Sequence, residues 1–76
     1  MSTATLPEID SLLLVGETAG EVWHALDEHG PLSLTRLVKM IDAPRDVVLL
    51  GVGWLAREEK VQIDNVGRKR TVSLLP

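Results

Sequence analysis

The side chains best suited to acid–base or metal chemistry in this 76-residue sequence are two histidines and a group of glutamates. His24 and His29 are five residues apart, about 140° from each other around a helix, so they share no face on which to hold a metal ion. Glu17, Glu21 and Glu28 fall on one helix face, but paired carboxylates do acid–base work only where an enclosed site separates their pKa values. We therefore expect these residues to form a solvated, solubilising surface.

Other enzyme signatures are missing from the sequence. It contains no Ser–His–Asp arrangement, no phosphate-binding loop and no cofactor fingerprint. It also contains no cysteine, which excludes a thiolate metal site, a disulfide framework and a Cys nucleophile. A chain of this length has room for a binding surface but hardly for a deep substrate cleft. We expect a non-enzymatic domain with no cofactor, no metal and no small-molecule substrate.

The cationic side chains point instead to phosphate contacts. The net charge is −3, but residues 1–30 carry six acidic and no basic side chains, whereas residues 60–76 carry four basic side chains against Asp64. A basic end of this kind can meet the phosphates of DNA or an acidic protein surface. The alternative is that the basic run Arg68 to Arg70 is an ordinary solvated hairpin edge.

Apolar residues repeat with helical spacing in three segments. The first helix should end at Gly30, because glycine takes the left-handed capping conformation and Pro31 cannot continue the helix. The second should begin after Ser33, a good N-cap, and the third should run from about Pro44 to Glu59. The predicted inward stripes are Leu12, Val15, Ala19, Val22, Trp23 and Leu26 in the first helix, Leu34, Leu37, Val38 and Ile41 in the second, and Val47, Leu50, Gly51, Trp54 and Leu55 in the third.

After Lys60 the apolar spacing changes to two, which predicts a β-hairpin whose tip is Asn65 to Arg68, with Gly67 at positive φ. Leu32 is expected to add a very short strand beside this hairpin. Residues 1–10 are expected to be a poorly ordered lead-in, and residues 11–76 the folded domain. No apolar run is long enough to cross a membrane and the N-terminus has no signal-peptide pattern, so the expected location is the cytoplasm.

Three helices followed by a hairpin form the plan of a winged helix-turn-helix, an α+β fold. The chain resembles the small stand-alone winged helix-turn-helix family of bacteria and archaea that has no assigned biochemical role. The resemblance covers roughly residues 14–75 and is carried by Gly16-Glu17-Thr18-Ala19-Gly20 and Trp23, by Ser33 and Leu37, and by Gly53-Trp54-Leu55-Ala56-Arg57-Glu58. It implies DNA binding in general terms only. Glu59 stands where the family usually has glycine, so the turn into the hairpin is expected to be tighter or shifted.

The third helix is poorly equipped to read bases. Of its predicted outward residues, only Arg45 can make the bidentate guanine contact that reads a base edge. The other outward residues are small or apolar and are predicted to contact another protein, such as a second copy of the chain: Leu49, Val52, Gly53 and Ala56. Gly51 is expected to face the core, where its missing side chain either lets another helix approach closely or leaves room for the Trp54 indole, and the pair Gly16 and Gly20 is a weaker signal of close approach. For Gly53 the alternative is a shape requirement beside the hairpin.

Two functions therefore remain open. The first is a DNA-binding domain of the transcription-regulator type that acts as a homodimer on double-stranded DNA. Its candidate DNA contacts are Arg36, Lys39, Arg45, Arg68, Lys69 and Arg70. The second is a protein-interaction module that uses the third helix and binds no nucleic acid, an alternative that the acidic net charge favours.

Overall fold

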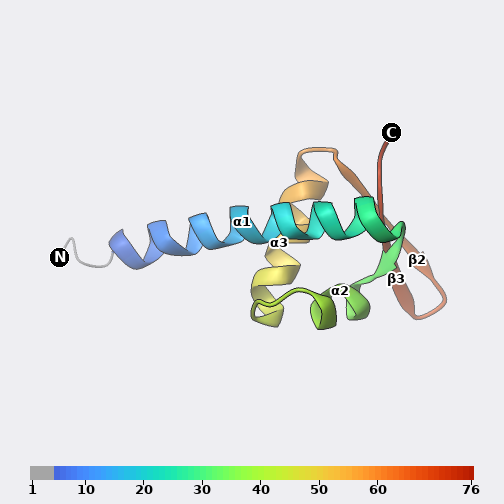
Figure 1. The fold of residues 1–76 in the computed structure, drawn as a ribbon, viewed down its shortest axis with the longest axis horizontal. Coiled ribbons are helices and arrows are strands. Elements are labelled where there is room, and N and C mark those ends of the chain that lie inside the picture. Colours follow the sequence, from blue (N-terminus) through green and yellow to red (C-terminus); the bar gives the residue numbers. More distant parts are fainter. Residues whose placement is uncertain (1–4) are drawn as a thin grey trace.

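The computed structural model describes the backbone of residues 5–76 and the side chains of residues 11–76. Within this range the helices are α1 (Thr5–His29), α2 (Leu34–Met40) and α3 (Arg45–Arg57). The strands are β1 (Leu32–Ser33), β2 (Val61–Val66) and β3 (Lys69–Leu74), in an antiparallel sheet of order β1-β3-β2. Figure 1 shows α1 lying across α3, with α2 below it and the β2–β3 hairpin at one end. The predicted α+β fold of three helices and a hairpin wing is confirmed.

Helix α1 is longer than its apolar stripe predicted. It begins at Thr5, so residues 5–10 of the expected lead-in continue the helix, and residues 1–4 lie outside the described residues. It ends where expected, because Gly30 adopts φ 82° and its amide donates to the Leu26 carbonyl at 2.8 Å. Its core positions Ala19 and Val22 are buried, but Leu12 is exposed because this end of α1 projects past α3 (Figure 1).

Helix α2 is capped as predicted. Ser33 has an extended backbone, and its Oγ accepts a hydrogen bond from the Arg36 amide at 3.1 Å. Leu37 is fully buried, while Arg36 and Lys39 are exposed, as their positions on the predicted helix indicated. Pro44 is the N-cap of α3 rather than its first residue. The two helices and the turn between them thus form the expected helix-turn-helix.

The predicted orientation of α3 is wrong by part of a turn. Val52, expected on the outward face, is only 2% exposed, and Ala56 packs against the core. Leu50 and Trp54, expected inside, are 58% and 39% exposed. The buried residues of this helix are Val48, Gly51, Val52 and Leu55. Most residues of α3 are apolar or glycine on every side, so periodicity alone could not decide which stripe faces inward.

Gly51 is the residue that sets this orientation. A Cβ added to it would lie 3.1 Å from the Ala19 amide nitrogen and 3.3 Å from the Ala19 Cα, both backbone atoms of α1. The expected close approach of another helix at Gly51 is therefore confirmed. Gly53 behaves differently, since an added Cβ there would meet nothing within 4 Å. Because Gly51 must face α1, Val48, Val52 and Leu55 are carried into the core with it.

The turn from α3 into β2 keeps a glycine-type geometry without a glycine. Glu59 has φ 61°, the left-handed conformation. Its amide donates to the Ala56 carbonyl at 3.0 Å, and the Lys60 amide donates to the Leu55 carbonyl at 2.9 Å, the pair of bonds that defines a Schellman motif. The expected tighter or shifted turn is not observed. Glu59 itself adopts the left-handed conformation, and both Schellman hydrogen bonds form.

The sheet supports the wing. Leu32 pairs with Val72, which confirms the short first strand, and Val66 pairs with Lys69 across the hairpin end. The turn is therefore Gly67–Arg68, two residues shorter than predicted, with Gly67 at φ 62° as expected. Val72 is fully buried and anchors the sheet to the helices. The core comprises Ala19, Val22, Ala25, Leu26, Leu37, Ile41, Val48, Val52, Leu55, Val61 and Val72.

Candidate nucleic-acid interface

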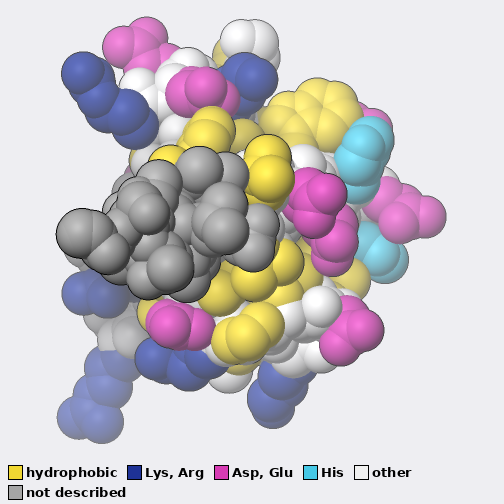
Figure 2. Space-filling model, turned by 90° about the vertical axis from the view of Figure 1, so that its left-hand side faces the viewer, with side chains coloured by type: hydrophobic (Ala, Val, Ile, Leu, Met, Phe, Trp, Pro, Cys, Tyr) yellow, Lys and Arg dark blue, Asp and Glu magenta, His cyan; other side chains and the backbone are white. Residues whose placement is uncertain are grey.

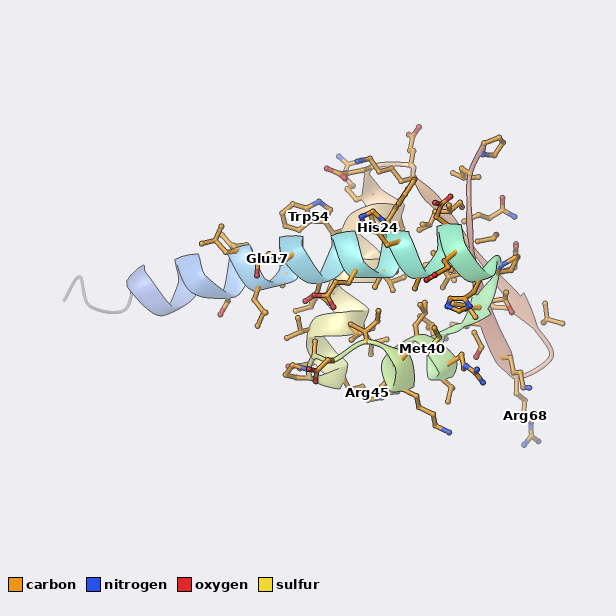
Figure 3. The ribbon with its side chains drawn as sticks, in the orientation of Figure 1. Glu17, His24, Met40, Arg45, Trp54 and Arg68 are labelled. Atoms are coloured by element: carbon orange, nitrogen blue, oxygen red, sulfur yellow. The ribbon has the colours of Figure 1, made fainter. Side chains whose placement is uncertain are left out.

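Four of the predicted DNA contacts line one groove. Its volume is about 690 Å³, and it runs between the start of α2, the first residue of α3 and the tip of the wing. We call it the basic groove; its lining residues are Ser33, Leu34, Thr35, Arg45, Asn65, Gly67, Arg68, Lys69 and Arg70. In Figure 3, Arg45 and Arg68 lie on the same lower side of the molecule. The fold thus brings together cations that are more than twenty residues apart in the sequence.

Local structure positions each of these cations. Arg45 follows the N-cap Pro44, so its side chain is presented at the start of α3. Arg68 is at the second central position of the tight turn that Gly67 permits. Arg70 pairs with Asn65 across the hairpin, and its Nε donates to the Asn65 Oδ1 at 3.3 Å. The hairpin therefore holds its cations at the edge of the groove.

The groove cations are available for an external anion. Among the described side chains, ion pairs join His29 to Glu28 and Lys60 to Glu58, and neither involves the groove. Asp46 lies beside Arg45 in the sequence, but its Oδ1 accepts a hydrogen bond from the Val47 amide at 2.9 Å. An excess of exposed, unpaired cations is the electrostatic requirement for contact with phosphate.

A smaller cavity extends the basic groove along α2. Its volume is about 160 Å³, and it is lined by Leu34, Thr35, Val38, Lys39, Arg45 and Leu49. It places Lys39 beside Arg45, so five of the six predicted contacts form a continuous surface. Arg36 is exposed on α2 but lines neither cavity.

Charge is segregated over the rest of the surface. On the face shown in Figure 2, Asp, Glu and His side chains gather on the right-hand side, and several Lys and Arg side chains lie along the lower edge. The acidic residues Glu17, Glu21 and Glu28 of α1 are exposed, as expected for a solvated face. The acidic side chains of α1 and the cations of the basic groove thus lie on different parts of the surface.

Sequence reasoning missed part of this site. Thr35 lines both cavities and Asn65 lines the basic groove, and both offer hydrogen bonds to a sugar–phosphate backbone. Asn65 was identified only as a turn residue, and Thr35 was not singled out at all. The sequence gives no signal for Thr35, because its place beside the wing depends on how α2 and the hairpin pack.

The predicted protein-contact surface on α3 does not form as a unit. Leu49 is half-buried beside α2, Val52 and Ala56 belong to the core or its edge, and only Gly53 is fully open. The side chains that α3 exposes are Asp46, Leu50, Trp54 and Arg57, together with Arg45. Arg45 is therefore the one cation that α3 exposes at its N-terminal end.

Within the described residues, no helix is long and apolar enough to cross a membrane. The same part of the chain contains no cluster of three His, Cys, Asp or Glu side chains that could hold a metal ion.

Comparison with known proteins agrees with this fold. Residues 8–74 match the family model described as winged helix-turn-helix domain (DUF2582). The chain is 35% identical over 63 residues to the uncharacterized protein MJ1608 of Methanocaldococcus jannaschii, a match covering 79% of this chain and 89% of that protein. It also resembles the solution NMR structure of protein BT2368 from Bacteroides thetaiotaomicron, with a TM-score of 0.73 and 38% identity over 80% of this chain and 74% of that one. The chain belongs to the winged helix-turn-helix domain family DUF2582.

Proposed function

We propose that this domain is a non-enzymatic, DNA-binding transcription regulator that acts as a homodimer. The main support for the proposal is the basic groove, which is lined by Arg45 of α3 and by Arg68, Lys69 and Arg70 of the wing. In winged helix-turn-helix proteins the second helix of the motif enters the major groove, and here that helix is α3. Cations on the wing then reach the adjacent phosphates. Such a regulator would work in the cytoplasm.

The number of groove cations sets the expected salt dependence. If Arg45 and the three wing cations each neutralise one phosphate, the slope of log K against log salt is about −3.6 for each protomer that contacts the DNA. The affinity of one protomer for mixed-sequence duplex DNA should then fall roughly 150-fold between about 50 and 200 mM salt. We expect affinity to be modest, because few side chains of α3 can read a base edge.

A matched pair of arginine variants tests the groove. Arg45 and Arg57 are exposed at opposite ends of α3, but only Arg45 lines the basic groove. We expect Arg45→Ala to reduce the slope by about one unit and Arg57→Ala to leave it unchanged. Replacing Arg68, Lys69 and Arg70 together by Ala should leave a slope of about −0.9. Equal changes in slope for Arg45→Ala and Arg57→Ala would show that the basic groove is not the DNA-binding surface.

A second function is supported by the exposed surface of α3. Leu50 is more than half exposed on the helix that would face DNA, and Asp46 lies beside it. A leucine and a carboxylate favour contact with a protein over contact with phosphate. If the wild-type domain does not bind duplex DNA at about 50 mM salt, where electrostatic binding is strongest, the protein-interaction module becomes the better assignment.

A further inference from the structure

The projecting half of α1 carries apolar side chains that the described residues leave exposed. Leu12 and Leu13 are each 62% exposed, at the end of α1 that extends beyond α3 (Figure 1). Trp54 of α3 lies close by, since a Cβ added to Gly16 would be 3.7 Å from its ring. We call Leu12, Leu13 and Trp54 the apolar face. Figure 2, a view onto this end of the molecule, shows several hydrophobic side chains at its surface.

A groove opens beside this face. Its volume is about 660 Å³, and its floor is the surface of α1 at Gly16 and Gly20. Trp23 and Trp54 line it, and Glu58 to Lys60 and the C-terminal residues close its far side. An added Cβ at Gly20 would meet nothing within 4 Å, so nothing in the folded chain requires a glycine there. In Figure 3, Trp54 stands on the side of α1 away from Arg45 and Arg68.

Helix α1 carries both the exposed leucines and part of the groove, so two copies of it can each supply what the other accepts. Leu12, Gly16 and Gly20 are four residues apart and follow one another along one side of α1. If two α1 helices pack antiparallel about a two-fold axis beside Gly16, each Leu12 lies opposite the partner's position 20. The side chains that project from one copy then enter the groove of the other, and the same contact is made twice, as an isologous interface requires.

A second copy of the chain is the occupant that supplies these side chains in the required register, because Leu12 and Gly20 are equally spaced on either side of Gly16.

We propose that two copies of the chain dimerise through antiparallel packing of their α1 helices, with Leu12 and Leu13 of each copy seated in the groove floored by Gly16 and Gly20 of the other. The inference rests on the homodimer of the proposed function and gives it an interface, but it does not depend on DNA binding. It also replaces α3 by α1 as the main dimerisation helix. Because the apolar face and the basic groove lie on different sides of the molecule, the dimer leaves both basic grooves open (Figure 3).

Sedimentation equilibrium without DNA tests this interface. Wild-type protein is measured from about 10 μM to 1 mM, the range in which weak dimers dissociate. We expect the mass to rise from 8.3 kDa towards twice that value. Leu13→Glu should weaken the dimer at least tenfold, because a carboxylate would be buried against Trp23 and Trp54 in a groove that already carries Glu58 and Glu59. The control is Val66→Glu, which adds the same charge at a 65% exposed side chain on the wing and should leave the dimer unchanged.

Two further variants separate this interface from others. Gly20→Ala should raise the thermal midpoint of the monomer, because open space surrounds Gly20 and alanine favours helix, yet weaken the dimer by filling the position opposite Leu12. Leu50→Glu should leave the dimer intact. A dimer that survives Leu13→Glu and dissociates with Leu50→Glu would overturn the α1 interface and keep the homodimer. A wild-type mass that stays at 8.3 kDa at every concentration would overturn both the α1 interface and the homodimer. DNA binding by the monomer would still be tested by the salt titration.

Salt gives an independent readout. Each copy carries a net charge of −3, with the negative charge concentrated in the first thirty residues, so the two α1 helices repel one another. Added salt screens this repulsion and should strengthen the dimer, while it weakens contact with DNA phosphates. Dimerisation that weakens with salt would contradict the apolar interface.

Discussion

Substituting alanine for Gly51 and for Gly53 should shift stability in opposite directions, although the two glycines are two residues apart in the same helix. Both are interior residues of α3. Alanine is favoured over glycine in a helix interior by roughly 0.8–1.0 kcal/mol, so propensity alone predicts that both variants are stabilised equally. Any difference between them must therefore come from tertiary packing.

The packing cost falls on Gly51 only. An alanine Cβ there would lie 3.1 Å from a backbone nitrogen of α1, so α1 and α3 would have to separate by a few tenths of an ångström. Overpacking of this kind typically costs 1–3 kcal/mol, which exceeds the gain in propensity. We expect Gly51→Ala to lose about 0.5–2 kcal/mol of stability. We expect Gly53→Ala, whose Cβ meets nothing, to gain about 0.5–1 kcal/mol.

Urea denaturation followed by far-UV circular dichroism measures both changes. In a domain of this size 1 kcal/mol corresponds to about 4–8 °C in Tm, so the variants should also separate clearly in thermal melts. Two protein concentrations are compared so that any contribution from dimerisation is recognised. If Gly51→Ala is as stable as Gly53→Ala, then α1 and α3 can move apart at no cost, and Gly51 does not set the orientation of α3.

Three further substitutions test other parts of the fold. Glu59→Gly should stabilise the domain by about 0.5–1 kcal/mol in urea denaturation, because it relieves the left-handed conformation while keeping both turn hydrogen bonds; a loss of stability would show that Glu59 is not strained. Ser33→Ala should cost about 1 kcal/mol by removing the α2 cap, and an unchanged denaturation midpoint would argue against that hydrogen bond. Leu37→Ala should cost about 2–5 kcal/mol, measurable as a large drop in Tm, since Leu37 is fully buried; a smaller cost would mean that the core closes around the cavity.

Local signals in the sequence predicted the parts of the fold that depend on local interactions. Gly30 ends α1, Ser33 caps α2 and Gly67 turns the hairpin, because each residue acts on backbone groups within four positions of itself. The short strand at Leu32 was also predicted, although its partner Val72 is forty residues away in the sequence.

The orientation of α3 could not be predicted in the same way. Leucine, valine and glycine occur on nearly all of its sides, so several stripes fit a period of 3.6 residues equally well. The choice among them depends on the approach of the Gly51 backbone to Ala19, a contact between residues more than thirty positions apart. The candidate site has a similar limit. The residue types of Arg45 and the wing cations were identified from the sequence, but their meeting in one groove depends on how α3 and the hairpin pack.

The two proposals constrain each other through the distribution of charge. If the domain binds DNA as proposed, the acidic side chains of α1 would repel the phosphates, and contact is expected on the side on which Arg45 and Arg68 lie (Figure 3). A dimer formed through the apolar face covers a different side and leaves this approach free. Its two-fold axis would then relate two basic grooves, and a symmetric pair of grooves requires a DNA site with two-fold symmetry. If selection from random duplexes returns an inverted repeat for wild-type protein and a single half-site for Leu13→Glu, the groove and the α1 interface act together; an unchanged inverted repeat would mean that a different interface spaces the two half-sites.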